Sequence, residues 1–290
     1  MMAAEPGLQP AGVRLQTVTR LHGASAAQPA QAEPDWLAEE VPVALVFNGL
    51  SQAVMMATPG DLDDFALGFA LTEGLLARAG DLYGVDVVPV QLAAGPAIEL
   101  RLAVSARTMA ALKDRRRTLA GRTGCGLCGT DSLAQVHRAL PIVPPTAVQA
   151  GALAQAQRGL RRWQAVQQLT GASHAAAWCG PDGAVRLVRE DVGRHNALDK
   201  LIGAMQRASV NPGDGFITIT SRASFEMVQK AAMAGVGLLA AVSAPTALAV
   251  DTAQRCGLAL AGFVRGDGLV AYSFPERFGL ATPLAAAAQD

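Results

Sequence analysis

The sequence predicts an α/β protein, with a smaller α+β N-terminal domain followed by a three-layer C-terminal domain. After residue 146, short and almost wholly apolar segments alternate with helical patterns, which is typical of a sheet covered by helices on both faces. A stretch rich in glycine, cysteine and proline separates this part from a β-rich first part. We therefore expect a loose tail (1–35), the α+β domain (36–120), a cysteine-bearing linker loop (121–145) and the α/β domain (146–290).

The expected elements of the N-terminal part follow from local patterns. Residues 1–35 are rich in Ala, Gln, Pro and Gly and carry too little periodic apolar surface to offset the entropy of ordering. Asn48 and Gly49 accept positive φ, which predicts a hairpin of the segments on either side of them. Asp61 is a candidate cap for the helix that follows it. The predicted strands are 41–47, 52–57, 83–90 and 97–104, and a second helix is predicted at 106–119.

The C-terminal part is predicted to alternate between strands and helices. Its predicted helices are 147–169, 197–208, 225–234 and 246–256. Its predicted strands are 173–179, 184–189, 216–220, 237–242, 258–264 and 269–273.

Composition excludes several classes of protein. Lys plus Arg equal Asp plus Glu at 24 each, so the chain has no global positive field of the kind that drives nucleic-acid binding. Its apolar runs are shorter than the roughly 20 residues that a membrane span requires. Four cysteines in 290 residues do not make a disulfide framework, and no signal-type segment is apparent. We expect a cytoplasmic protein that binds neither nucleic acid nor membranes.

The first candidate site is the segment 124–129, Gly-Cys-Gly-Leu-Cys-Gly, which contains Cys125 and Cys128. Its three glycines let the backbone bend around both sulfurs. Three interpretations of the C-x-x-C spacing stay open: structural zinc ligands, a redox pair, or a sulfur-carrying nucleophile with a second thiol nearby. Zinc normally needs four ligands, and the sequence has no second C-x-x-C or H-x-x-x-H pattern, so we expect no structural metal.

Residues 189–200 form a second candidate site, because ionisable side chains are concentrated at a predicted junction between a strand and a helix. Glu190 and Asp191 can accept hydrogen bonds, while Arg194 and His195 can donate to a phosphate or supply a general acid. The alternative is a buried ion-pair network that orients the helix 197–208. Both interpretations stay open.

Polar residues also follow the ends of the predicted strands, where ligands of open α/β sheets bind. Ser224 can cap the next helix, whose free N–H groups would suit an anion together with Arg222. Thr246 is a candidate cap for the helix after the next strand. The residues expected to bind a ligand here are Ser221, Arg222 and Ser224. Residues 263–268 (Phe263, Val264, Arg265, Gly266, Asp267 and Gly268) most simply form a hairpin turn between the last two strands, although Arg265 could also hold a phosphate or a guanine-type group.

Together these segments resemble the FdhD family, the formate dehydrogenase accessory sulfurtransferases. The resemblance spans roughly residues 40 to 280. It rests on residues 124–129, 174–177, 190–200, 221–230 and 262–263.

The resemblance implies a cytidine-deaminase-like α/β core in a homodimer. Such a protein takes sulfur from a cysteine desulfurase and passes it to bis-molybdopterin guanine dinucleotide, before this cofactor is inserted into formate dehydrogenase. The resemblance also implies that Cys125 carries a persulfide, that Cys128 is a second relay or resolving thiol, and that residues 263–268 meet the guanine dinucleotide end. His195, Ser221, Arg222 and Ser224 are added from the reasoning above. The alternative function is a non-catalytic chaperone for the same cofactor, in which the cysteines only assist.

Overall fold

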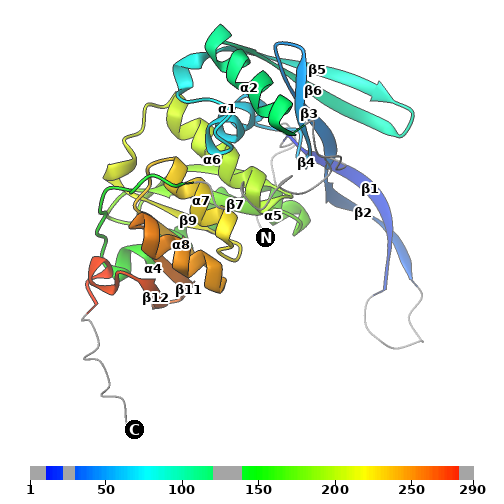
Figure 1. The fold of residues 1–290 in the computed structure, drawn as a ribbon. Coiled ribbons are helices and arrows are strands. Elements are labelled where there is room, and N and C mark those ends of the chain that lie inside the picture. The colour runs from blue at the N-terminus through cyan, green and yellow to red at the C-terminus, as the bar shows by residue number, and fades with distance from the viewer. Residues whose placement is uncertain (1–10, 22–29, 120–138, 281–290) are drawn as a thin grey trace.

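The β-structure of the chain forms two sheets and a separate hairpin (Figure 1). The computed structural model describes residues 11–21, 30–119 and 139–280. A four-stranded sheet lies in the N-terminal part and a six-stranded sheet in the C-terminal part. The mixed α/β class is therefore confirmed, whereas the cytidine-deaminase-like topology and the domain boundaries stay predictions.

The N-terminal sheet has the strand order β4-β3-β6-β5. Its strands are β3 (Val41–Phe47), β4 (Leu50–Ala57), β5 (Leu82–Leu92) and β6 (Gly95–Val104). β3 and β4 form the predicted hairpin, in which Asn48 and Gly49 take φ values of 44° and 83°. Alternate residues of β3 are buried, and helix α1 (Leu62–Thr72) packs on this face through Phe65. The short turn η1 (Ala79–Asp81) precedes β5, and helix α2 (Ala106–Leu119) follows β6 as predicted.

The C-terminal sheet has the strand order β12-β11-β10-β9-β7-β8. Its strands are β7 (His174–Cys179), β8 (Val185–Asp191), β9 (Phe216–Ile219), β10 (Leu238–Ala241), β11 (Ala259–Arg265) and β12 (Gly268–Ser273). β9, β10 and β11 run parallel, while β7, β8 and β12 pair antiparallel with their neighbours.

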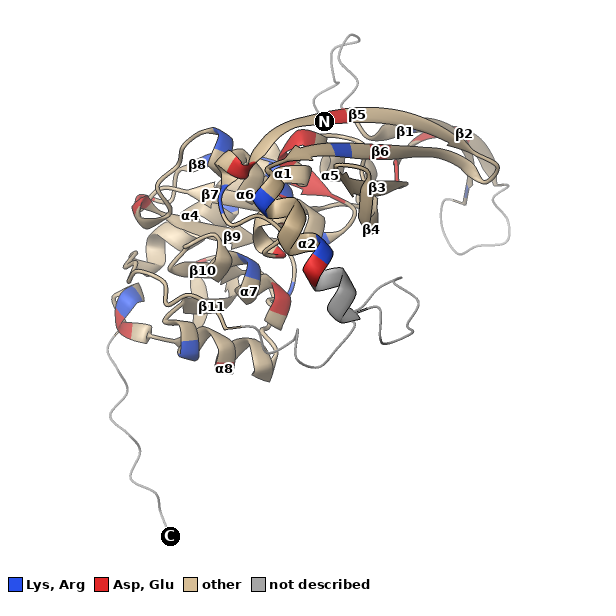
Figure 2. Cartoon of the chain, turned by 45° about the horizontal axis from the view of Figure 1, so that its top comes forward, with Lys and Arg blue, Asp and Glu red and all other residues tan. Residues whose placement is uncertain are grey.

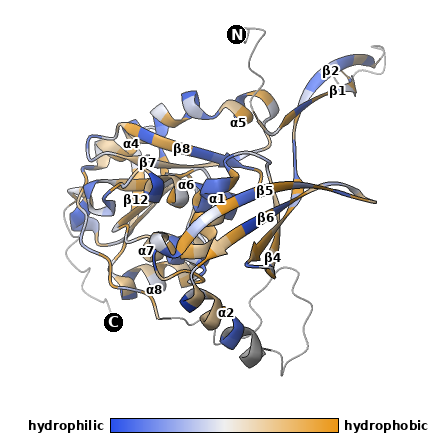
Figure 3. Cartoon of the chain, turned by 90° about the horizontal axis from the view of Figure 1, so that it is seen from above, coloured by the Kyte–Doolittle hydropathy of each residue, from blue (hydrophilic) through white to orange (hydrophobic). Residues whose placement is uncertain are grey.

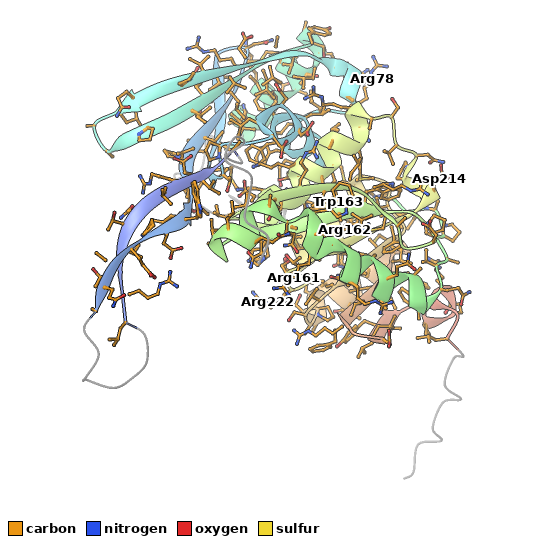
Figure 4. All side chains as sticks on the ribbon, turned by 180° about the vertical axis from the view of Figure 1, so that it is seen from behind. Arg78, Arg161, Arg162, Trp163, Asp214 and Arg222 are labelled. Atoms are coloured by element: carbon orange, nitrogen blue, oxygen red, sulfur yellow. The ribbon has the colours of Figure 1, made fainter. Side chains whose placement is uncertain are left out.

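Helices cover both faces of this sheet, as the apolar strands predicted. Helices α6 (Arg194–Arg207), α7 (Phe225–Met233) and α8 (Ala247–Cys256) lie on one face. Helix α4 (Ala150–Leu160) lies on the other face, and it is seen in front when the molecule is viewed from behind (Figure 4). In β9, Ile217 and Ile219 pack toward the first set of helices and Phe216 toward α4. The turns η3 (Pro212–Asp214) and η4 (Pro275–Phe278) complete this part.

The two parts meet where α1 crosses α6 at close range. A Cβ atom built on Gly68 would lie 1.8 Å from the backbone oxygen of Asp199, and one built on Gly203 would lie 1.9 Å from that of Asp64. No side chain fits at either position, so the two glycines allow the helix backbones to touch. This contact fixes the N-terminal sheet relative to the face of the C-terminal sheet that carries α6.

The prediction of a loose tail over residues 1–35 is wrong for the residues described. Strands β1 (Val13–Arg20) and β2 (Gln31–Ala38) form an antiparallel hairpin that extends from the rest of the chain (Figure 3). Leu15 pairs with Trp36 across the two strands, and β2 packs beside helix α5 (Ala165–Thr170). The prediction was based on the mean composition of the segment, which carries no information on the cross-strand pairs that stabilise a hairpin.

The prediction of a single helix over residues 147–169 is also wrong, because the structure has two separate helices in this segment. Helix α4 ends at Leu160, the turn η2 (Arg161–Trp163) follows, and Gln164 has the non-helical angles φ −92° and ψ 73° before α5 begins. The carboxylate of Glu190 accepts hydrogen bonds from the N–H groups of Val166 and Gln167, both at 2.9 Å. The N-terminus of α5 is therefore capped by Glu190, a residue outside the helix and its flanking segments. No local sequence pattern indicates this contact.

Of the three predicted helix caps, only Thr246 caps through its side chain, accepting from the N–H of Ala249 at 3.3 Å. Asp61 lies at the predicted position before α1, but its backbone is left-handed with φ 52° and its side chain makes no cap. It lies 3.4 Å from Arg189 instead. Ser224 precedes α7 as predicted, yet its hydroxyl makes no cap either.

Candidate functional site

The carboxyl ends of three parallel strands meet at one edge of the C-terminal sheet, here named the carboxyl edge. The loops after Ile219, Ala241 and Arg265 leave from it. β7 runs antiparallel to β9, so its first residue, His174, lies at the same edge, paired with Asp191 at the end of β8. This is the edge at which open α/β sheets bind ligands.

The structure places the described residues that were predicted to bind the cofactor on this edge. They are His195, Ser221, Arg222, Ser224 and residues 263–268. The other two predicted site residues, Cys125 and Cys128, lie outside the described residues.

The loop after β9 is joined to the loop after β10 by backbone contacts. Ala223 forms an isolated parallel bridge with Pro245, and the N–H of Thr246 donates to the oxygen of Ala223 at 3.0 Å. Ser221 is buried and donates its hydroxyl to the oxygen of Arg222 at 3.0 Å, so it shapes the loop. Arg222, which is labelled in Figure 4, is exposed. Arg222 is therefore available to a ligand, whereas the hydroxyl of Ser221 is used in a hydrogen bond to the backbone of its own loop.

The turn 263–268 joins β11 to β12, as predicted. Phe263 has a positive φ of 50° and an exposed fraction of 43%. A bulky residue rarely takes this conformation, so the loop holds the ring outward at some cost in strain. The Nε of Arg265 donates to the oxygen of Val242 at 3.0 Å, and Asp267 pairs with Arg158 of α4 at 2.7 Å. Val264 is buried, whereas Gly266 and Gly268 are exposed.

The turn between β8 and α6 is held by a buried network around Asp191. One carboxylate oxygen of Asp191 accepts from the N–H of Gly193 at 2.8 Å and from the side-chain amide of Asn196 at 3.0 Å. The other lies 2.7 Å from the Nζ of Lys200 and accepts from the N–H of Thr58 at 3.0 Å. The hypothesis of a buried ion-pair network at this junction is confirmed for these residues. Helix α6 begins at Arg194, three residues earlier than predicted.

His195 lies in the first turn of α6, where it faces the first turn of α7. Its Nε2 lies 2.8 Å from Oε2 of Glu226, the distance of an ion pair, although the ring N–H is not aligned as a hydrogen bond to that oxygen. The close contact with His195, together with the charges of Lys230 and Arg194, outweighs burial and lowers the pKa of Glu226. Burial, followed by the charges of Arg194 and His195, lowers the pKa of His174. Ionisable groups from α6, α7 and β7 thus gather at this point of the carboxyl edge.

A second buried network connects α7 to the N-terminal part. The Nζ of Lys230 lies 2.9 Å from a carboxylate oxygen of Asp199 and 2.8 Å from Glu73, and it donates to the hydroxyl of Thr72 at 3.0 Å. Burial opposes the charge of Lys230, but Asp199 and Glu73 outweigh it and raise the pKa of Lys230. The first turns of both α6 and α7 are therefore positioned by residues of the N-terminal part.

Sequence reasoning missed Glu226 and the contributions of Thr58, Thr72 and Glu73. Glu226 lies two residues beyond the predicted cap Ser224, and an acid in the first turn of a helix was the available signal. No sequence pattern indicates the contacts of Thr58, Thr72 and Glu73 with the C-terminal part. Thr58 and Lys200, for example, are 142 positions apart.

The two described cysteines are poor nucleophiles. Cys179 and Cys256 are free thiols and both are buried. Burial raises the pKa of Cys179 to about 12 and also raises the pKa of Cys256, so neither forms a thiolate readily at neutral pH. Within the described ranges, no group of three or more His, Cys, Asp or Glu residues is arranged to hold a metal ion.

Charges of both signs are spread over the elements in view in Figure 2. In the part of the chain that the structure describes, no helix is both long enough and apolar enough to cross a membrane.

Comparison with known proteins connects this chain to one family. The sequence model of the FdhD/NarQ family matches residues 38–279. The chain is 59% identical over 244 residues to the "Sulfur carrier protein FdhD" of Variovorax paradoxus, covering 84% of this chain and 86% of the relative. It is 52% identical over 252 residues to the protein of the same name from Bordetella petrii, covering 87% of this chain and 89% of the relative.

A solved structure shares the fold. It is the crystal structure of a candidate formate dehydrogenase accessory protein from Desulfotalea psychrophila, with a TM-score of 0.69 and 19% identity, covering 92% of this chain and 99% of that one. The family match spans most of this chain and both relatives exceed half identity. The chain therefore belongs to the FdhD/NarQ family.

Proposed function

We propose that this protein is a cytoplasmic sulfur carrier that supports the maturation of formate dehydrogenase. The observation that carries the proposal is the 59% identity, over most of both chains, to a relative named as a sulfur carrier protein. The name of the solved neighbour points to formate dehydrogenase as the client. The proposal includes a cysteine desulfurase as sulfur donor, a homodimer, and a cytidine-deaminase-like core.

The cysteines support the assignment of the carrier thiol by elimination. Of the four cysteines in the chain, Cys179 and Cys256 are buried and have raised pKa values. Cys125 and Cys128 are the two that remain, and three glycines surround them in the sequence. Elimination does not rank these two thiols, and by analogy with the FdhD family we assign Cys125 as the carrier and Cys128 as the second thiol.

The loading step is a thiol exchange without net oxidation. The Cys125 thiolate attacks the outer sulfur of the donor persulfide, the new S–S bond forms on Cys125, and the donor cysteine leaves as a thiolate. In the release step, the Cys128 thiolate attacks the Cys125 sulfur and a disulfide forms. The two thiols supply the two electrons that turn the outer sulfur into sulfide, which the acceptor receives. A cellular thiol reductant then restores both cysteines.

The acceptor in this proposal is bis-molybdopterin guanine dinucleotide, bound as a substrate at the carboxyl edge. Residues 263–268 meet its guanine end, with Phe263 exposed for stacking and Arg265 nearby. Arg222, His195 and Ser224 face the rest of the molecule. Arg222 is exposed, so it is available to the phosphates.

A reconstituted maturation assay tests this function. Purified protein, a cysteine desulfurase, cysteine, the cofactor and apo formate dehydrogenase are combined, and formate oxidation is measured. Sulfur transfer predicts loss of activity for Cys125→Ala and full activity for the control Cys256→Ala. Full activity of Cys125→Ala, with loss of activity for Arg265→Ala, would instead support the non-catalytic chaperone.

A further inference from the structure

The hairpin of β1 and β2, here named the arm, has one face without charged side chains. Residues that lie directly opposite each other in an antiparallel pair share a face of the sheet. The register of the arm places eight uncharged residues on one face, namely Val13, Leu15, Thr17, Thr19, Ala32, Pro34, Trp36 and Ala38. The charged residues of the arm lie on the other face, where Arg20 pairs with Glu33 and Asp35.

The uncharged face of the arm is exposed beyond its base. Val13 is buried at the base, whereas Leu15 is 52% exposed. The residues farther out on this face are also exposed, namely Thr17, Thr19, Ala32 and Pro34. The arm extends away from the rest of the chain (Figure 3). A two-stranded hairpin is only marginally stable in water unless its hydrophobic face packs on another element, so this face requires a matching surface.

A matching surface lies on the N-terminal sheet, opposite to the face on which α1 packs. Ala44 lies beside Val54 and Pro42 beside Met56, while the alternate residues of β3 point toward α1. Val54 and Met56 are 47% and 48% exposed. The sequences of β3 and β4 contain no charged residue. The surface, here named the β3–β4 face, comprises Pro42, Ala44, Val46, Ser51, Val54 and Met56.

The arm and the β3–β4 face match in width and in length. Each is two antiparallel strands wide, with strands of 8 residues in the arm and of 7 and 8 residues in β3 and β4. Such surfaces pack face to face as two layers of a sandwich, about 10 Å apart. The neighbouring strand β6 places Glu99 and Arg101 beside the β3–β4 face, and these two residues pair with each other at 2.8 Å. An arm on this face therefore meets compensated charges at its border.

The arm of the same chain is held away from this face. The N–H of Glu39, which follows β2, donates to the oxygen of Gly12 at 2.8 Å. A Cβ atom built on Gly12 would lie 2.1 Å from the side chain of Thr58, the residue that follows β4. The base of the arm is therefore fixed at one end of β3 and β4, and the arm continues outward from that end.

We propose that two copies of this chain exchange arms, so that the uncharged face of each arm covers the β3–β4 face of the partner. The inference rests on the proposed function, which includes a homodimer, and it names the interface of that dimer. Two-fold symmetry forms both contacts at once.

The area of the contact favours exchange over a contact between two arms. The six residue pairs from Leu15–Trp36 to Arg20–Gln31 form the exposed part of the arm. At about 3.3 Å per residue and about 10 Å for two strands, this part covers about 200 Å². Two arms stacked on each other would bury only about 400 Å² in total, whereas exchange buries about 800 Å² in flat projection, close to the lower limit of a specific interface. We expect a dissociation constant in the micromolar range.

Analytical ultracentrifugation of the full-length protein over micromolar concentrations tests the proposal. Leu15→Glu on the arm and Val54→Lys on the β3–β4 face should each weaken the dimer about tenfold or more, because each buries an unpaired charge in both contacts. The matched controls are Gln16→Glu, on the charged face of the arm, and Val270→Lys, a valine of β12 that is 44% exposed. Neither control should change the dissociation constant.

Mixing the two variants identifies which surfaces meet. In a dimer of Leu15→Glu with Val54→Lys, one contact is unaltered and the other brings opposite charges together, so the mixture should be more dimeric than either variant alone. A mixture of Leu15→Glu with Val54→Glu places like charges in the second contact and should show a smaller gain. A misfolded variant cannot complement another, so the gain also shows that both variants are folded.

The opposite results would overturn the exchange of arms. They are a wild type that stays monomeric, a Val54→Lys dimer as tight as that of wild type, weakening by either control, and equal gains in the two mixtures. These measurements involve no sulfur. A failure of sulfur transfer to Cys125 would overturn the proposed function and leave the dimer interface standing, and a monomeric protein that still accepts sulfur would do the reverse.

Discussion

Lys200 and Asp191 form an ion pair at 2.7 Å in which both side chains are fully buried. The Nζ of Lys200 also donates to the backbone oxygen of Thr58 at 2.9 Å. Asp191 in turn orders the turn that presents Arg194 and His195. The pair therefore joins β4, β8 and α6 at the start of the candidate site.

Lys200→Met should destabilise the protein by about 3–5 kcal/mol, because it leaves the carboxylate of Asp191 buried without its counter-charge. Urea unfolding followed by circular dichroism measures the change. Lys113→Met, on an exposed position of α2, should change stability by less than about 0.5 kcal/mol. A loss of less than about 1 kcal/mol for Lys200→Met would mean that the pair is dispensable.

Gly203→Ala should force α1 and α6 apart, because the new Cβ meets the backbone oxygen of Asp64. We expect a loss of about 3 kcal/mol in the free energy of unfolding. Gly151→Ala is the matched control, since Gly151 lies in α4 with no atom near its missing side chain. That change should be neutral or stabilise the protein slightly, because alanine favours helix. Equal effects of the two substitutions would contradict the close crossing.

His174 should make the stability of the protein depend on pH. Its pKa is lowered from the model-peptide value of 6.5 by burial and by the charges of Arg194 and His195. Between the folded and unfolded pKa values, the unfolded chain binds more protons, so stability falls as the pH falls through this window. In thermal unfolding scans, His174→Gln should lose less stability than wild type when the pH is lowered through 6.5. Identical pH profiles for the two proteins would contradict the lowered pKa.

Most elements of the C-terminal part could be predicted, because each carries its own pattern. The strand 216–220 was expected from five consecutive apolar or β-branched residues, and β9 covers 216–219. The turn at Asn48 and Gly49 was equally local. Helix α5, in contrast, begins on the carboxylate of Glu190, and the hairpin of β1 and β2 depends on pairs such as Leu15 with Trp36. These contacts join residues that are not neighbours in the sequence, so they leave no periodic trace.

The position of the candidate residues in the fold could be predicted better than their contacts. Ser221, Arg222 and Ser224 lie after β9 at the carboxyl edge, as the order of strand and helix predicted, and their role in binding stays a prediction. Ser221 proved to bind its own loop, because a hydroxyl in a tight turn finds a backbone oxygen first. The pairing of His195 with Glu226 joins two helices, and their relative position depends on the whole sheet.

The most direct test of the central claim is the location of a transferred sulfur by peptide mass spectrometry. The protein is incubated with a cysteine desulfurase and isotopically labelled cysteine, alkylated without reductant, and digested. The account predicts one labelled persulfide on the peptide that contains Cys125, absent from Cys125→Ala and retained in Cys256→Ala. Labelling of Cys125→Ala as strong as that of wild type, or label on Cys179 or Cys256, would contradict it.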